Sequence, residues 1–122
     1  MNPSDRIIGG LLGTLVGDAL GVPVEFTGRS TRDLDPVTGM RGYGTWNQPP
    51  GTWSDDGAMA LVSADTLTSH GWDLDRMMEG FRRWYDEAWW TAHDKVFDIG
   101  GTTRMAIIDY RINTDASTSG RC

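Results

Sequence analysis

The sequence has one cysteine, two histidines and no excess of basic charge, with 11 lysines and arginines against 17 acidic residues. The single cysteine, Cys122, excludes an intramolecular disulfide, which fits a reducing compartment. A formal net charge of −6 argues against a nucleic-acid surface, because phosphates require a basic patch. The acidic excess fits either a cation-binding pocket or an ordinary soluble surface. We therefore expect a cytoplasmic protein that does not bind nucleic acid.

Long uninterrupted apolar segments are missing as well. The most apolar part lies near the N-terminus, where Asp5 and several glycines interrupt it, so we expect it to be too short for a membrane span. It also lacks the basic start and the small-residue cleavage site of a secretion signal. What the sequence does contain is a hydrophobic fraction of 39% and an aromatic fraction of 10%, enough for a folded core. The length of 122 residues fits one domain.

Apolar residues recur at helical spacing in four segments and predict an all-α fold. The predicted helices cover residues 5–20, 58–68, 74–90 and 102–112. Ser4 is expected to cap the first helix and Asp73 the third, because their side chains can accept hydrogen bonds from free backbone N–H groups. Residues 27–52 are predicted to form a long loop, strand-like in part near residues 41–43, and residues 113–122 a loose tail.

Two of these helices carry patterns that predict packing. Glycines at positions 9, 13 and 17 line one face of the first helix, and since each glycine weakens a helix, we expect another backbone to approach closely there. The third helix has an apolar stripe that is expected in the core rather than around a cofactor. The stripe consists of Leu74, Met77, Met78, Phe81, Trp84 and Tyr85. Trp84, Trp89 and Trp90, like the glycine face, are expected to need neighbours beyond these 122 residues.

Acidic residues stand beside small ones at helix ends within residues 17–26, 51–61 and 97–103. In the second segment, Ser54, Asp55 and Asp56 open a helix, where the chain still turns and both carboxylates can reach one pocket. Hard cations prefer such oxygen ligands, and a cation offsets the repulsion between adjacent carboxylates. The simpler interpretation, which spacing alone favours, is that Ser54 caps the helix and the two acids stabilise its first turn.

The remaining candidates carry less information by themselves. Glu25 and Asp98, each taken singly, are typical of solvated acids in loops. Gly100 and Gly101 precede a helix that is predicted to start near Thr102, where backbone N–H groups can cradle a phosphate, although a glycine pair is a weak signal.

The order of the three segments is more specific than any one of them. GDALGVPVEF, then TWSDDGAMAL, then FDIGGTTRMAI resemble the ADP-ribosylglycohydrolase family, which includes the dinitrogenase-reductase-activating glycohydrolases. The resemblance spans residues 6–110. It implies an all-α fold with a two-metal centre of Mg²⁺ or Mn²⁺. It also implies hydrolysis of the glycosidic bond between ADP-ribose and a protein side chain or small molecule.

The resemblance also implies the metal ligands. Ser54, Asp55 and Asp56 stand where the family's Thr-Asp-Asp supplies them, and the serine keeps the hydroxyl. Gly57 stands where the family usually has a second threonine. This departure affects the hydrogen bonds that surround the ligands.

The same resemblance implies which residues act on the substrate. Glu25 matches the acid that ends the first motif and assists catalysis at the scissile ribose in parts of the family. Asp98 matches an acid that faces the substrate ribose and is proposed to handle the attacking water. The main base differs among family members, so both are catalytic candidates. Gly100, Gly101 and Thr102 are the candidate substrate-binding residues.

Two motifs of the family are missing from these 122 residues: the Gly-Asn-Gly-Ser-type diphosphate loop with its Met-Arg, and the Asp-x-Asp-Thr motif that completes the metal centre. We therefore expect a partial ADP-ribosylglycohydrolase-like helical domain with a long loop between its first two helices and weak cation binding. One alternative is a non-enzymatic remnant. Others are a split half that pairs with a complementing C-terminal half or with itself, and a shortened reading of a longer gene.

Overall fold

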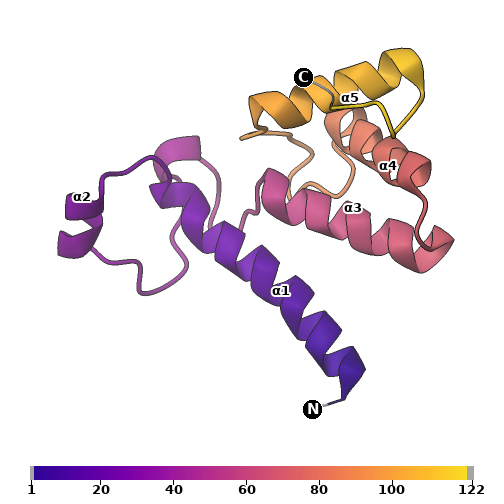
Figure 1. Ribbon diagram of the computed structural model, residues 1–122. Helices are drawn as coiled ribbons and strands as arrows, with labels where there is room; N and C mark the ends of the chain where they lie inside the picture. Colours follow the sequence, from indigo (N-terminus) through magenta and orange to yellow (C-terminus); the bar gives the residue numbers. More distant parts are fainter. Residues whose placement is uncertain (1, 121–122) are drawn as a thin grey trace.

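The computed structural model describes residues 2–120, and over that range it is all-α, as predicted. Its five α-helices are joined by loops and two short 3-10 turns, and one isolated bridge between Tyr43 and Gln48 is the only strand-like pairing in this range (Figure 1). The helices are α1 (Pro3–Gly21), α2 (Arg29–Leu34), α3 (Asp55–His70), α4 (Leu74–Glu87) and α5 (Gly101–Asn113). The 3-10 turns are η1 (Val22–Val24) and η2 (Gly44–Trp46).

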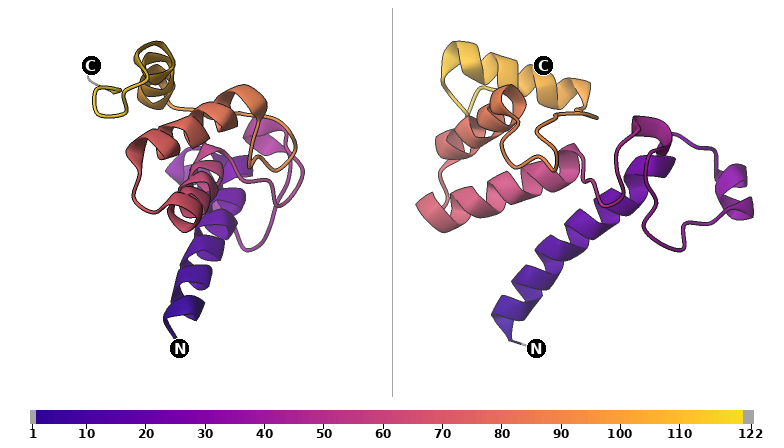
Figure 2. Two further views of the ribbon diagram at one scale, coloured as in Figure 1. Left: turned by 90° about the vertical axis from the view of Figure 1, so that its right-hand side faces the viewer. Right: turned by 180° about the vertical axis from the view of Figure 1, so that it is seen from behind.

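Helix α3 connects the two parts of the molecule, because it contacts both α1 and α4, while α5 packs against α4. The views agree that α3, α4 and α5 form one group (Figures 1 and 2). The first turns of α1 extend away from that group, and α2 lies beyond the last turns of α1.

The buried core lies among α3, α4 and α5 and consists of Ala58, Val62, Trp84 and Ile107. Gly80 allows α4 to approach α3, since a Cβ atom there would lie 2.6 Å from Val62 Cγ1. The stripe predicted for α4 is confirmed in part: Met78, Phe81 and Tyr85 pack against the core, whereas Leu74 is exposed. The prediction that Trp84 needs a neighbour beyond this chain is wrong, because Trp84 is 1% exposed within it.

The predicted cap of the first helix is wrong by two residues. Asn2, not Ser4, caps α1: its Oδ1 accepts from the Asp5 backbone N at 2.8 Å, and Asp5 Oδ2 accepts from the Asn2 backbone N at 3.3 Å. The helix starts earlier because Pro3 fits its first position, where a missing N–H costs nothing. The predicted cap of α4 is confirmed, since Asp73 accepts from the Arg76 backbone N at 3.0 Å.

Helix α4 ends at Glu87, three residues before the predicted end at 90. Ala88 has a φ of 57° and Trp90 a φ of 60°, so the chain leaves the right-handed helical region there. The apolar spacing continued past this point because Trp89 packs against the core from the following turn.

Helix α1 leaves most of its apolar surface exposed. Ile7, Ile8, Leu12 and Val16 are each at least half exposed, and of the whole helix only Ala19 is buried. At the glycines of positions 9, 13 and 17, a Cβ atom would meet nothing within 4 Å. The backbone that was predicted to approach this face is therefore not found among residues 2–120.

The prediction that this N-terminal segment is too short for a membrane span is not confirmed. Residues 3–24 have a window of mean hydropathy 1.7, which is long and apolar enough to cross a membrane by length and composition. One such helix near an N-terminus does not separate a membrane span from a core helix of a soluble protein. At its C-terminal end the helix makes polar contacts with the start of α3 through Asp18.

The segment between the first two predicted helices is more ordered than a plain loop. It contains α2 and η2. The guanidinium of Arg41 donates two hydrogen bonds of 2.6 Å to the Asp35 carboxylate. At the other end, residues 116–120 form turns, and the Ala116 backbone N donates to Asp75 Oδ1 at 3.0 Å. Residues 121–122, with the single cysteine, lie outside the described residues. The looseness of the tail stays a prediction.

Candidate active site

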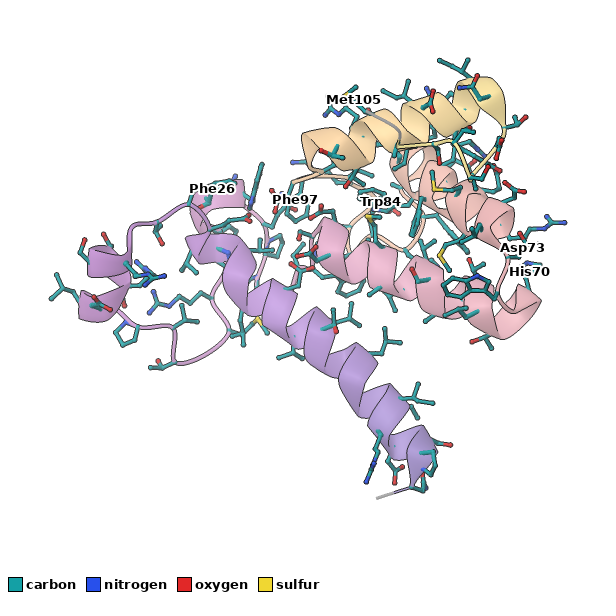
Figure 3. The ribbon with its side chains drawn as sticks, viewed as in Figure 1. Phe26, His70, Asp73, Trp84, Phe97 and Met105 are labelled. Carbon is teal, nitrogen blue, oxygen red and sulfur yellow. The ribbon has the colours of Figure 1, made fainter. Side chains whose placement is uncertain are left out.

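A cleft of about 580 Å³ opens where the end of α1 meets the start of α3. Its polar lining comes from segments far apart in the sequence: Thr14, Asp18, Glu25, Ser54, Asp56 and Asp98. Phe26 and Phe97, the neighbours of two of these acids, are labelled next to each other between the end of α1 and the starts of α3 and α5 (Figure 3). Trp46 stands between them, with ring centroids 6.0 Å and 5.6 Å away. The fold thus brings four of the sequence-predicted site residues, Glu25, Ser54, Asp56 and Asp98, to one cleft.

Asp18 joins α1 to the start of α3. Its Oδ2 accepts from the backbone N of Ser54 at 2.8 Å and of Gly57 at 2.7 Å, and its Oδ1 accepts from Ser54 Oγ at 2.7 Å. The helix is therefore capped by a carboxylate from another helix. The simpler interpretation, in which the Ser54 side chain is the cap, is wrong, because the hydroxyl makes no capping bond.

The two adjacent acids follow in the first turn of α3, as predicted. Burial raises the pKa of Asp55, and the charge of Asp56 raises it further. Ser54 Oγ lies 3.2 Å from Asp55 Oδ1, a longer contact than the 2.7 Å bond that the same hydroxyl makes to Asp18 Oδ1. Asp56 is exposed and lines the cleft, whereas Asp55 is half-buried beside it.

Glu25 and Asp98 form a second pair of acids in the cleft. The indole Nε1 of Trp46 donates to Glu25 Oε2 at 2.5 Å and so fixes that carboxyl group. Burial raises the pKa of Asp98 to about 7, with further contributions from a hydrogen bond with Glu25 and from the charges of Glu25, Asp55 and Asp18. Asp98 also has a φ of 64°, a backbone conformation that non-glycine residues seldom adopt and that clusters at functional sites.

The three candidate substrate-binding residues do not line the acidic cleft. Gly100 is the cap of α5 and Gly101 its first residue, and neither lines the acidic cleft. Thr102 faces a separate apolar hollow of about 270 Å³ between α3, α4 and α5. The acidic cleft is instead continued, through Asp98, by a hollow of about 310 Å³ whose lining includes Trp46 and Arg104.

Sequence reasoning missed three of these residues. Asp18 stands in the first motif and could have been found as an acid in the interior of an apolar helix, where a charge needs a partner. Trp46 and Arg104 carried no such signal, because only the folded chain brings them to the cleft and its extension.

The donor atoms of the cleft suit a hard cation, but the set is not complete. Among residues 2–120 no three or more histidine, cysteine, aspartate or glutamate side chains are grouped closely enough to hold a metal ion. Carboxylate and hydroxyl oxygens are nevertheless the ligands that Mg²⁺ and Mn²⁺ prefer. A cation there would also relieve the repulsion that raises the pKa of Asp55. The residues therefore fit part of a metal site.

The protein is all-α and has an acid-lined cleft at the start of a helix. The family model of the ADP-ribosylglycohydrolases matches residues 1–121, so the chain belongs to that family. The predicted family and fold class are confirmed.

Similar proteins agree with this assignment. The chain is 38% identical over 124 residues to the ADP-ribosylarginine hydrolase Tri1 of Pseudomonas putida (strain GB-1), covering 95% of this chain and 33% of that protein. It is 33% identical to the ADP-ribosyl-[dinitrogen reductase] glycohydrolase of Rhodospirillum rubrum, covering 87% of this chain and 35% of that protein. A solved structure of an ADP-ribosylglycohydrolase-related protein complex matches with a TM-score of 0.75 and 37% identity, covering 92% of this chain and 35% of that one. The chain thus spans about a third of the length of these relatives.

Proposed function

We propose that this chain provides the N-terminal side of a metal-dependent site that hydrolyses the bond between ADP-ribose and a protein side chain. The observation that carries the proposal is the convergence of Glu25, Asp56 and Asp98 on one cleft from three separate segments. The names of its relatives support the substrate class, since they describe hydrolases of ADP-ribosylarginine and of ADP-ribosylated dinitrogen reductase. Full activity is expected only when further metal and diphosphate ligands complete the cleft.

Ser54, Asp55 and Asp56 would hold Mg²⁺ or Mn²⁺. When bound, the ion would supply a Lewis acid that polarises a ribose hydroxyl or a water molecule. The remaining steps belong to the carboxyl pair. Glu25 and Asp98 line the cleft and are hydrogen-bonded to each other. In the proposed reaction one of them takes a proton from water and the other gives a proton to the departing side chain. The raised pKa of Asp98, about 7, suits either task near neutral pH.

A second candidate function is that of a binding half without activity of its own. The exposed apolar face of α1, with Ile7 72%, Ile8 57% and Leu12 55% exposed, favours it. Contiguous apolar surface of this kind marks an interaction site. The matching partner would be a polypeptide that corresponds to the remaining two-thirds of the family's length, either as a separate protein or as a continuation of this one.

Calorimetric titration of the folded chain with Mn²⁺ and then ADP-ribose tests the first proposal. Binding of both ligands that is lost in Asp55→Asn/Asp56→Asn would support it and would justify hydrolysis assays on ADP-ribosylarginine. The matched control is Asp33→Asn/Asp94→Asn, which removes two charges at exposed positions outside the cleft. No binding by a well-folded chain would contradict a working half-site. Measuring the mass in solution with and without the C-terminal two-thirds of a relative would then separate pairing from self-association.

A further inference from the structure

The carboxylate of Asp18 accepts more hydrogen bonds than any other acid that lines the cleft. It accepts three hydrogen bonds of 2.7 to 2.8 Å, two at Oδ2 and one at Oδ1. Two of the donors belong to Ser54, which immediately precedes α3, and the third is the backbone N of Gly57 in the first turn, which also carries Asp55 and Asp56. A group engaged in this way has little capacity left for a cation or substrate. Its effect on the site passes through the residues it holds.

The bond from Ser54 determines where the hydroxyl proton lies. Ser54 Oγ has one proton and two acceptors within reach, Asp18 Oδ1 at 2.7 Å and Asp55 Oδ1 at 3.2 Å. The shorter bond takes the proton, since a hydroxyl donates only one. The lone pairs of Ser54 Oγ are then left for other partners, and the Asp55 carboxylate keeps its own. Ser54 is 6% exposed, so bulk water does not compete strongly for this proton.

The contact between Gly57 and Asp18 is closely packed. A Cβ atom on Gly57 would lie 2.8 Å from Asp18 Oδ2 and 2.7 Å from Trp53 Cβ, closer than such contacts allow. Glycine at position 57 therefore lets its own N–H reach the carboxylate at 2.7 Å. The glycine at position 57 thus has a local explanation: its backbone N–H bonds directly to Asp18, and a side chain would lie too close to Trp53 and Asp18.

We propose that Asp18 is a positioning residue. It anchors the start of α3 to α1, and it accepts the Ser54 hydroxyl proton, so that this proton does not point toward Asp55. The Ser54 oxygen and the Asp55 carboxylate then both remain available as acceptors for a cation. This inference rests on the proposed function for the role of Ser54 and Asp55 as ligands. The hydrogen-bond arrangement itself does not depend on a bound metal.

Asp18→Asn is the most informative variant, because it has nearly the same shape. Its carbonyl oxygen can still accept from the backbone N of Ser54 and Gly57, but its amide must now donate to Ser54 Oγ. The serine proton is then redirected to Asp55 Oδ1, the second acceptor within reach. Asp18→Ala removes the anchor altogether, and Asp33→Asn on exposed α2 is the matched change of charge.

Two readouts separate this inference from the proposed function. In amide hydrogen exchange, Ser54 and Gly57 are expected to stay protected in wild type, Asp33→Asn and Asp18→Asn, and to lose protection in Asp18→Ala. In Mn²⁺ titration, the affinity of Asp18→Asn is expected to fall by roughly tenfold or more, with Asp33→Asn unchanged. Combining Asp18→Asn with Ser54→Ala should cost no more affinity than Ser54→Ala alone, because both act through one hydroxyl.

Each outcome decides one of the two ideas. Unchanged amide protection in Asp18→Ala, or unchanged Mn²⁺ affinity in Asp18→Asn, would overturn the positioning role. If wild type binds no Mn²⁺, the proposed metal function of the isolated chain fails. The amide pattern and the NMR signal of the Ser54 hydroxyl proton, which should be present in wild type and altered in Asp18→Asn, then decide the positioning role alone.

Discussion

Helices α1 and α4 both carry apolar side chains at helical spacing, but within the described chain only α4 buries them well. Trp84 in α4 is 1% exposed, whereas Ile7 in α1 is 72% exposed and Ala19 is the one buried residue of that helix. The difference arises because α4 lies between α3 and α5, while α1 contacts α3 and little else. The group of α3, α4 and α5 therefore has its own core, and α1 is held mainly at its C-terminal end.

The largest effect on stability is expected from a substitution in the buried face of α4. Trp84→Ala removes the largest fully buried side chain, so we expect the free energy of unfolding to fall by about 3–5 kcal/mol. Denaturant unfolding followed by circular dichroism measures it. Leu12→Ala on the exposed face of α1 is the control and should change stability by less than about 0.5 kcal/mol. Equal losses in the two variants would show that α1 is buried in solution.

A pair of glycine substitutions should change stability in opposite directions. Gly57→Ala places a methyl group against Trp53 and Asp18, and we expect a loss of about 1–3 kcal/mol. Gly13→Ala meets nothing within 4 Å and improves helix propensity, so a gain of about 0.5–1 kcal/mol is expected. Thermal unfolding of the two variants side by side provides the measurement. A loss at position 13 would reveal a close neighbour on the glycine face.

The acidic cleft should make stability depend on pH in one direction. The pKa of Asp98 is raised to about 7 from an ordinary value of 3.8, so the folded chain holds a proton that the unfolded chain releases between those values. The contribution of this group to stability therefore falls as the pH rises from about 4 to about 8. Unfolding midpoints of wild type and Asp98→Asn across this range should diverge with rising pH in favour of the variant. Parallel curves would contradict the raised pKa.

The smallest effect on stability is expected from a substitution on the exposed face of α1. Leu12→Gln in α1 is expected to change the free energy of unfolding by less than about 0.5 kcal/mol, because this side chain is 55% exposed. Any association through the α1 face should weaken in the same variant. Sedimentation measures the association, alone and with a complementing polypeptide. An oligomer that is unaffected by the change would place the contact elsewhere.

Much of the fold was predictable from spacing alone. Four of the five helices follow from apolar periodicity, and the Asp73 cap follows from its place before Leu74. Local rules failed where tertiary contacts overrode them. Helix α4 stops before Trp89, although the apolar pattern continues, because Ala88 turns the chain and returns the indole to the core. Helix α2 is only six residues long and too polar for a periodic signal.

The residues of the candidate site could be predicted from the sequence, but their spatial arrangement could not. Ser54 was assigned an oxygen ligand role by the motif and a capping role by spacing, and the structure shows that its hydroxyl bonds to Asp18 instead of capping. No local rule connects positions 18 and 54, since the bond joins two residues that are 36 positions apart in the chain. That Gly100 and Gly101 do not line the acidic cleft was equally beyond sequence spacing.

The sequence by itself determined the helical class, the family and the identity of the acids, because periodicity and motif order are properties of the chain. Only the tertiary structure decided which acids face one another. Hydrogen bonds from α3 to Asp18, the contact of Trp46 with Glu25, and the burial of Asp98 depend on segments that meet only after folding. The physical reason is that hydrogen bonding and desolvation act over a few ångströms in space, whatever the distance along the sequence.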